Sequence, residues 1–365
     1  MLLERLSLAN FRNYASLEWE PAGGLNLILG SNAQGKSNLL EAIALLATGK
    51  SFRAARESEL IRFGGSPASV VGSAHVGAGS LNLACSIAST GGTTRKTYTI
   101  NGEGVRYARF LGSLKVVTFV PDDLGLVSGP PAMRRAMLNE ALSLADRRYY
   151  HELARYRKAA LQKNALLRDA SSPDRDLLAT YDATMVQSGT ALMLARRHYI
   201  AALGETATSV YGHWIPNERL EVRYAPNVVF DTPSEAAVAG ELSRRLSEQR
   251  PAELARKRCL VGPHRDDVEL TLDAQALARF GSQGQKRTAV LALKLAEYAV
   301  MRDRTGESPL LLLDDVLSEL DAARAQAFLD ALHGSEQAFV TATEPVRFGL
   351  AATAWRVAAG AVTAC

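Results

Sequence analysis

The sequence predicts an α/β fold in which helices flank a β-sheet and an inserted arm is formed by two long antiparallel helices. Two apolar runs predict buried strands: residues 25–29 lead into a glycine-rich loop, and residues 310–313 end in two aspartates. Between them, two long segments with apolar residues at three- and four-residue steps predict the arm. We expect the sheet domain in residues 1–130 and 258–365 and the arm in residues 131–257.

The loop after the first strand has the composition of a phosphate-binding loop, and a helix-like segment, residues 38–46, follows it. Its glycines let the backbone wrap closely around an anion, because no Cβ blocks left-handed dihedrals. Successive N–H groups and the helix N-terminus then point at phosphate oxygens. The predicted nucleotide-binding residues are Gly30, Ser31, Asn32, Ala33, Gln34, Gly35, Lys36 and Ser37.

Two side chains of the loop suggest which nucleotide binds. Lys36 would reach the β- and γ-phosphates, and the hydroxyl of Ser37 would complete the shell of a Mg²⁺ ion. The alternative is a glycine turn that happens to precede a helix and binds no phosphate. The strand before the loop and the helix after it argue against that alternative. The sequence therefore predicts a nucleoside triphosphate ligand.

Length and composition are those of an ordinary globular protein. The chain has 365 residues, enough for two or three domains, with 47% hydrophobic and 22% charged residues. Its net charge of +4 does not by itself argue for nucleic acid, so that argument needs local clustering of charge.

Several features predict a cytoplasmic protein without a membrane partner. Cys85, Cys259 and Cys365 lie far apart with no C-x-x-C motif, which favours free thiols in a reducing compartment and no zinc site. The first residues lack a basic stretch followed by an apolar core, so we expect no secretory signal. No apolar run approaches the ~18 residues that span a membrane.

The second apolar strand carries the predicted catalytic acids. Ligands bind at the carboxyl ends of parallel strands, where Asp314 and Asp315 would emerge. We expect Asp314 to hold Mg²⁺, directly or through water, and Asp315 to orient or deprotonate the attacking water. Taken alone, the two acids would equally suit a solvated loop.

A third motif, residues 282–285, stands directly before an amphipathic segment, residues 288–302. Its serine hydroxyl, backbone donors and helix dipole suit an anion, although such a tetrapeptide alone usually marks a helix start. Its place some thirty residues before the acidic strand makes it more specific. We therefore add Ser282, Gly284 and Gln285 to the predicted nucleotide contacts.

This order of motifs resembles the ABC-type P-loop ATPase head, a mixed sheet flanked by helices. The resemblance implies an ATP-dependent homodimer, because the serine turn of one protomer caps the γ-phosphate held by the other. Residues 318–321 match the D-loop of such heads. Residues 341–344 lack the switch histidine that many ABC heads keep there. Asp315 stands where a glutamate is usual, which implies slow hydrolysis.

The segment between the motifs predicts a helical hairpin over residues 133–212, roughly 45 Å long at 1.5 Å per residue. Apolar positions recur through residues 142–167 and residues 178–203. Between them, residues 169–173 predict a cap followed by Pro173 at the first helical position.

The first helix of the hairpin has a basic polar face, represented by Arg147, Arg148, Arg155 and Lys158. A basic excess on an elongated arm suits a phosphate backbone, whereas a merely solvated helix face is the competing interpretation. Farther on, residues 262–267 contain His264 and Arg265, which we expect to contact phosphates or to brace the head. The compact spacing there offers no second nitrogen ligand for a metal.

Along essentially its whole length the chain resembles the RecF family, the recombination-mediator ATPases of bacteria. The resemblance rests on several segments: the phosphate loop and residues 8–14, 50–53, 121–139, 262–267 and 282–288. Residues 121–139 are the most specific, although Met137 stands where the family usually has an aromatic residue. Similarity to related DNA-repair heads implies that Arg12 approaches the phosphates of the nucleotide.

The resemblance also implies a function. RecF-like proteins bind DNA at gaps and at single-strand/double-strand junctions in an ATP-dependent manner. With RecR and RecO they help to load RecA onto gapped DNA, and they support replication restart and SOS induction. The implied activity is a weak, DNA-stimulated ATPase with ATP and Mg²⁺ as cofactors. Two alternatives remain at this point: a transporter-type ABC subunit, and a non-hydrolysing scaffold that keeps ATP as a structural ligand.

Overall fold

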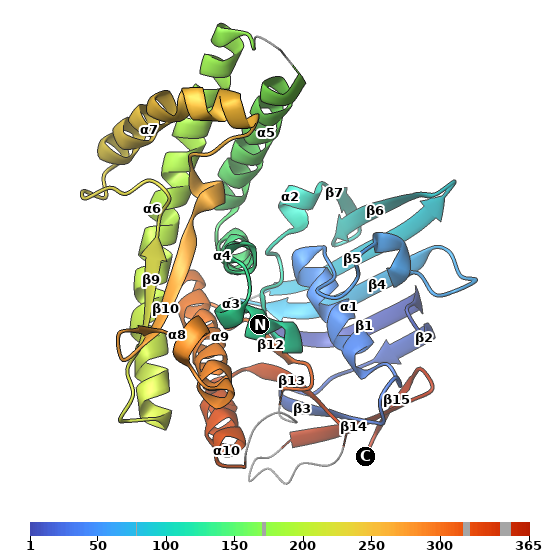
Figure 1. Ribbon diagram of the computed structural model, residues 1–365. Helices are drawn as coiled ribbons and strands as arrows, with labels where there is room; N and C mark the ends of the chain where they lie inside the picture. The colour runs from blue at the N-terminus through green and yellow to red at the C-terminus, as the bar shows by residue number, and fades with distance from the viewer. Residues whose placement is uncertain (78, 170–172, 317–321, 344–351) are drawn as a thin grey trace. The chain divides into compact units, whose positions relative to one another are not determined.

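The computed structural model describes residues 1–77, 79–169, 173–316, 322–343 and 352–365. The described chain divides into two compact units, which are considered separately below (Figure 1). The first unit comprises Met1–Asp123 and Lys294–Cys365, and the second comprises Leu124–Leu293. Among the described residues, no helix combines the length and the apolar character needed to cross a bilayer.

The first unit contains the predicted mixed sheet. Among the described strands its order is β15-β14-β3-β13-β12-β8, in which β15 alone runs antiparallel to its neighbour. The strands are β3 (Gly24–Leu29), β8 (Val116–Phe119), β12 (Leu310–Leu313), β13 (Gln337–Ala342), β14 (Ala352–Ala358) and β15 (Ala361–Ala364). Every residue of β12 and β13 is buried, which explains the continuous apolar sequence of β12 and the apolar centre of β13, and the sheet confirms the predicted α/β class.

A second, antiparallel sheet completes this unit and was not predicted. Its order in the described residues is β2-β1-β4-β5-β6-β7. The strands are β1 (Leu2–Phe11), β2 (Tyr14–Trp19), β4 (Ala68–Val76), β5 (Gly79–Thr90), β6 (Thr93–Ile100) and β7 (Glu103–Val105). Buried and accessible residues mix along β4 and β5, as expected for a sheet with one face on the core, whereas β6 near the edge has no fully buried residue.

The helix that follows the phosphate loop, α1 (Lys36–Thr48), contacts strands of both sheets. Burial on both sides explains why Leu39 through Ala47 are all buried, where a surface helix would show one apolar stripe. The helix begins after Gly35 and ends at Gly49, both in left-handed conformations. The unit is completed by η1 (Glu57–Leu60), α2 (Tyr107–Phe110), η2 (Pro121–Leu124), α10 (Ala322–Ala331) and η5 (Leu332–Gly334).

The second unit is mainly helical. Two long helices, α5 (Arg147–Asp169) and α6 (Arg175–Trp214), pack against each other, as predicted for the helical hairpin. The other elements are α3 (Gly125–Ser128), α4 (Pro131–Ala145), β9 (Leu220–Ala225), α7 (Glu235–Arg256), η3 (Pro263–Arg265), β10 (Asp267–Leu272), β11 (Gln275–Ala276) and α8 (Leu277–Phe280). The helix α9 (Gln283–Thr305) begins in this unit and ends in the first.

Three details differ from the sequence analysis. The first predicted arm helix is two helices, α4 and α5, separated at Asp146, whose carboxylate accepts a hydrogen bond from the N–H of Arg148 at 2.8 Å. The second begins only at Arg175, because Asp174 caps it by accepting from two backbone N–H groups. Residues 258–293, which we placed with the sheet domain, belong to the second unit.

Buried ion pairs hold the helices of the second unit together. Lys163 of α5 pairs with Asp182 of α6 at 2.7 Å and with Glu253 of α7. Arg196 of α6 pairs with Asp266 at 2.8 Å. Truncation of one partner in such a pair leaves a buried charge uncompensated, so these contacts specify how the helices pack.

Candidate nucleotide-binding site

The phosphate loop has a backbone conformation that requires its glycines. Gly35 has φ +115°, and a Cβ there would lie 2.6 Å from Nδ2 of Asn13. A Cβ on Gly30, at φ +159°, would lie 2.4 Å from the carbonyl oxygen of Val357. The loop residue Ala33 is also left-handed, at φ +64°. The loop therefore curls tightly in a way that side chains at either glycine would prevent.

Side chains around the loop donate hydrogen bonds to its carbonyl groups. Asn13 donates from Nδ2 to the carbonyl of Gln34 at 2.9 Å, and the Tyr14 hydroxyl donates to the carbonyl of Gly35 at 3.0 Å. Among the described residues, the backbone N–H groups of residues 32–35 donate to no protein acceptor. With the carbonyls held elsewhere, a row of N–H donors remains at the start of α1, as an anion site requires.

Lys36 places its ammonium group within this loop. Nζ donates to the carbonyl of Ser31 at 3.0 Å and also to that of Gly30, and the residue is only 9% exposed. Burial lowers the pKa of Lys36, and the nearby carboxylates of Asp315 and Asp314 act in the opposite direction. A cation that is partly stripped of water interacts strongly with an incoming phosphate.

The hydroxyl of Ser37 meets the carboxylate of Asp314, as the metal prediction requires. Ser37 Oγ donates to Oδ1 of Asp314 at 2.7 Å, and Oγ1 of Thr341 donates to the same oxygen at 3.0 Å. Asp314 is anchored by its own N–H, which donates to the carbonyl of Phe119 on β8 at 2.9 Å. A hydroxyl and a carboxylate are the hard oxygen ligands that Mg²⁺ prefers, so these residues fit the ion.

The second aspartate lies at the mouth of the same site. Asp315 is exposed, has φ +53°, and its N–H donates to Oγ1 of Thr341 at 2.9 Å. The left-handed backbone of Asp315, two residues after the end of β12, turns the chain sharply, so the two carboxylates lie in different environments. Asp314 is 6% exposed and fixed by hydroxyl groups, whereas Asp315 is open to solvent.

These side chains line one cavity of about 290 Å³. Lys36, Ser37, Asp314 and Asp315 all contribute to its wall, although the two aspartates lie far from the loop in sequence. The structure therefore brings the two halves of the predicted site together within the first unit. Nothing in this arrangement depends on the second unit.

Three further residues belong to the site and were not assigned to it from the sequence. Arg53 lines the cavity, and its Nη1 donates to Oδ1 of Asn38 at 3.3 Å. Asn13 supports the loop, and Thr341 links the two aspartates. Asn13 and Arg53 lie in the segments that resemble the RecF family, so that signal was available. Thr341 lies in the buried strand β13, at the start of the segment where many ABC heads keep a switch histidine and this chain has none.

Arg12 lies against a buried acid. Its Nε and Nη2 donate to the carboxylate of Glu41 on α1 at 2.8 and 2.7 Å, and its Nη1 donates to the carbonyl of Glu59. Glu41 is fully buried and also accepts a hydrogen bond from Ser51. Arg12 therefore ties the N-terminal sheet to α1, and it does not line the phosphate cavity.

The serine turn belongs to the second unit and forms a capping box. Ser282 Oγ accepts from the N–H of Gln285 at 3.2 Å, and Oε1 of Gln285 accepts from the N–H of Ser282 at 2.8 Å. Nε2 of Gln285 donates to Glu218 at 2.9 Å, and the carbonyl of Gly284 accepts from Thr288. The turn is thus a well-formed helix N-terminus. The predicted D-loop, residues 318–321, and Glu344 lie outside the described residues.

The basic residues of the arm are exposed on α5. Arg155 is engaged by Glu152 at 3.2 Å and by Gln187 at 2.9 Å. Lys158 is exposed and has no ion pair among the described residues. Arg147 and Arg148 stand, also exposed, at the start of the helix.

His264 and Arg265 brace the second unit. Nδ1 of His264 lies 2.6 Å from the Tyr156 hydroxyl, and Nη2 of Arg265 donates to the carbonyl of Cys259 at 3.0 Å. Burial lowers the pKa of His264 to about 4, so the ring is neutral near pH 7. A neutral histidine offers a phosphate no charge, which leaves bracing as the role that the structure supports.

Known proteins similar to this chain match it along nearly its whole length. The sequence profile of the family "RecF/RecN/SMC N terminal domain" matches residues 2–362. The DNA replication and repair protein RecF of Symbiobacterium thermophilum is 42% identical over 353 residues, covering 94% of this chain and 92% of that protein. The protein of the same name from Geobacillus thermodenitrificans is 37% identical over 374 residues, covering both chains completely.

Solved structures agree with the sequence comparison. The structure of the recombination mediator protein RecF-ATP in the RecFOR pathway is 33% identical with a TM-score of 0.91, covering 100% of this chain and 97% of that one. A crystal structure of an Smc head bound to the C-winged helix domain of ScpA has a TM-score of 0.58 at 16% identity, covering 100% of this chain and 97% of that one. The second likeness concerns the fold alone, and it supports the ABC-type head.

Proposed function

The chain belongs to the RecF family, and on that premise we propose that it is an ATP-dependent DNA-binding protein of recombinational repair and replication restart. Membership supports a role in DNA replication and repair. The observation that carries the proposal is the cavity in which Lys36, Ser37 and Asp314 meet. Acting on chromosomal DNA, such a protein would work in the bacterial cytoplasm.

The nucleotide proposed for the cavity is ATP with Mg²⁺. Residues 30–37 would bind the phosphates through backbone N–H groups, with Arg53 beside them. Ser37 and Asp314 would hold the metal ion, which supplies neutralisation of charge on the β- and γ-phosphates. The ammonium group of Lys36 would leave the carbonyls of Gly30 and Ser31 and donate hydrogen bonds to the γ-phosphate oxygens.

Asp315 is the residue proposed to act on water. Its carboxylate is exposed at the mouth of the cavity, where an attacking water would be oriented and would give up its proton. Aspartate is one methylene shorter than the glutamate usual at this place in ABC heads, so we propose slow turnover that DNA stimulates. The main role of such a weak ATPase would be to bind DNA, and hydrolysis of ATP would be secondary.

We propose that ATP joins two copies of the chain. Ser282, Gly284 and Gln285 present a helix N-terminus, whose N–H groups and dipole attract an anion. In the ABC-type arrangement this turn belongs to the second subunit of each nucleotide site. We propose that the chain consists of an ATPase head and an inserted helical arm. The head would form the dimer, and the arm would remain free to contact DNA.

The proposed DNA ligands are gaps and single-strand/double-strand junctions. Arg147, Arg148, Arg155 and Lys158 are exposed on one helix and can contact phosphates without reading bases. The RecF relative solved with ATP is named a recombination mediator of the RecFOR pathway. On that basis we propose RecR and RecO as partners, help in loading RecA, and a contribution to SOS induction.

One experiment tests the proposal directly. Binding of a fluorescent gapped duplex is measured by anisotropy, and the mass of the protein by sedimentation, each with and without Mg-ATP. We expect ATP to produce a dimer and tighter DNA binding, with both effects lost in Lys36→Ala and kept in Lys50→Ala, an exposed lysine beyond α1. A monomer with ATP-independent DNA binding would refute the proposal.

A further inference from the structure

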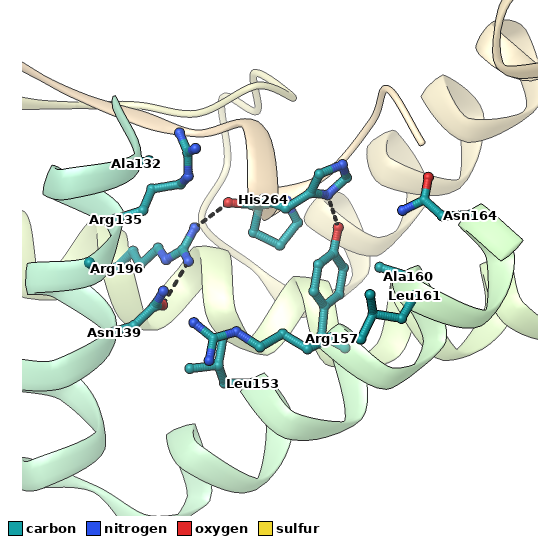
Figure 2. A pocket seen from close by; sticks show the side chains of 13 residues that line it. Ala132, Arg135, Asn139, Leu153, Arg157, Ala160, Leu161, Asn164, Arg196 and His264 are labelled. Carbon is teal, nitrogen blue, oxygen red and sulfur yellow. Dashed lines mark hydrogen bonds between the residues drawn. The ribbon is translucent and has the colours of Figure 1, made fainter. Parts of the chain in front are cut away.

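A second cavity of about 410 Å³ lies wholly within the second unit and shares no lining residue with the phosphate cavity. It is enclosed by α4, α5, α6 and η3, and Figure 2 shows the side chains that line it. Much of the wall is apolar, including Leu153, Ala160 and Pro263. Such a volume and lining suit a ligand the size of a few side chains.

The cavity carries more positive charge than its surroundings neutralise. Three arginines line it, one from each arm helix: Arg135, Arg157 and Arg196 (Figure 2). Arg196 is neutralised by Asp266, at 2.8 Å. Among the described residues, Arg157 donates to nothing. Arg135 donates to the backbone carbonyl of Asp266 at 2.7 Å, and the nearby carboxylates of Asp267 and Asp266, which attract it, are already paired with Arg134 and Arg196.

The neutral polar groups of the cavity also present donors. Oδ1 of Asn139 already accepts from Arg196 and from Tyr149, and Oδ1 of Asn164 accepts from the N–H of Cys259 at 2.7 Å. Within the described part of the chain, the amide nitrogens of both asparagines have no acceptor. A ligand that satisfies this cavity must therefore bring negative charge and hydrogen-bond acceptors.

The rim of the cavity adds an apolar requirement. Leu161 is 69% exposed and lies one helical turn after Arg157 on α5, so the two side chains are neighbours at the opening. A carboxylate beside an apolar side chain would match this pair. A DNA phosphate, hydrated and without apolar atoms of its own, would leave the apolar wall unmatched and lose its water.

The cavity also differs in position from the basic face of the arm. On α5 the lining residues Leu153, Tyr156, Arg157, Ala160, Leu161 and Asn164 recur at helical spacing and form one stripe. At about 100° per residue, Arg155 falls on the opposite side of the helix, whereas Lys158 lies between the two surfaces, three residues before Leu161. The same helix thus offers two separate surfaces, which can be altered independently.

We propose that this cavity binds an acidic, partly apolar peptide segment of a partner protein. Arg157 and Arg135 hold a carboxylate at the opening, and the asparagine amides donate to the peptide carbonyls. An adjacent leucine-like or phenylalanine-like side chain of the peptide packs against Leu153, Ala160 and Pro263. The site needs neither ATP nor DNA.

The test uses the full-length protein and a short fluorescent peptide in which aspartate alternates with leucine and phenylalanine. Its binding is followed by anisotropy without nucleotide. We expect Arg157→Ala to weaken binding about tenfold or more, since a charge-assisted hydrogen bond is lost. Leu161→Ser should also weaken it, whereas Arg155→Ala, which removes an exposed cation on the opposite side of α5, should not.

Control peptides separate charge from apolar contact. Replacement of aspartate by asparagine, or of the apolar residues by serine, should each abolish most of the binding. Equal binding to the wild type and to Arg157→Ala would overturn the proposal, and so would an acidic peptide that fails to bind at all. If a gapped duplex displaces the peptide and Arg157→Ala loses DNA affinity, the cavity contacts nucleic acid and the proposal is wrong.

Discussion

Ser37 donates its hydroxyl hydrogen to Asp314 at 2.7 Å, across 277 residues of sequence. Ser37 lies in the first turn of α1, and Asp314 directly follows β12. Their contact brings two separate sequence motifs together in one candidate metal site, because β3 and β12 both pair with β13 in parallel and end at the same side of the sheet.

The first prediction concerns this pair. Asp314→Asn keeps the shape of the side chain but removes the charge that Mg²⁺ needs, so the Mg²⁺ concentration for half-maximal nucleotide binding should rise by about 10- to 100-fold. A titration of Mg²⁺ against a fluorescent ATP analogue measures it. The control is Asp330→Asn, an exposed aspartate of α10. An unchanged Mg²⁺ requirement would show that Asp314 is not a metal ligand.

The second prediction separates binding from hydrolysis. Asp315→Asn should leave ATP binding and dimer formation in place while phosphate release falls by about 10²- to 10⁴-fold, the usual contribution of a general base. Single-turnover measurement of phosphate release checks this result, with Asp330→Asn again as the control. Equal background rates in the wild type and the variant would favour a scaffold that only holds ATP.

A third prediction rests on the backbone of the loop. Gly35→Ala forces a Cβ into left-handed backbone at φ +115° and to within 2.6 Å of Asn13. Strain of about 1–3 kcal/mol should appear as a lower thermal midpoint and weaker ATP binding. Gly212→Ala, in α6 with open space around the added methyl, should be neutral or slightly stabilising. Equal melting of both variants would contradict the conformational argument.

The serine turn yields a fourth prediction, which distinguishes its capping role from a phosphate contact. Ser282→Ala removes the cap and should cost about 1 kcal/mol. Ser282→Asp keeps a capping oxygen but places a negative charge where a γ-phosphate would bind, so stability should persist while the ATP-dependent dimer is lost. Thermal melting and sedimentation report the two effects. A normal dimer in Ser282→Asp would argue against any phosphate contact there.

The fifth prediction is a pH dependence. The carbonyl of Cys259 can only accept, so Nε2 of His264 carries the hydrogen and Nδ1 accepts from the Tyr156 hydroxyl. Because burial lowers the pKa of His264 from 6.5 to about 4, the unfolded chain binds the proton more readily. This contribution to stability is complete above pH 6.5 and is lost as the pH falls toward 4.

The expected loss from His264 is about 2 kcal/mol at pH 5, from a shift of 1.36 kcal/mol per pH unit. Urea unfolding between pH 7.5 and pH 5 measures it in the wild type and in His264→Gln, where the slope should become shallower. His75→Gln, at an exposed position on β4, should keep the wild-type slope. Parallel curves for wild type and His264→Gln would show that the histidine is not responsible.

Local motifs were predicted well because each depends on neighbours in sequence. The strands β3 and β12 and the glycine loop appear where the residue pattern placed them. The antiparallel sheet was missed because polar residues such as Thr93, Arg95 and Lys96 weaken its alternation. The split between α4 and α5 was missed because apolar spacing continues across Asp146, whose carboxylate caps the start of a new helix.

The phosphate loop, the acids after an apolar strand and the long arm helices could be predicted from residue order alone, since short-range spacing and backbone preference govern such features. Three features became known from the folded chain: Ser37 meets Asp314, Arg12 pairs with Glu41, and His264 is buried and neutral. Those outcomes depend on parallel pairing and burial between residues far apart in the chain, for which local sequence carries no signal.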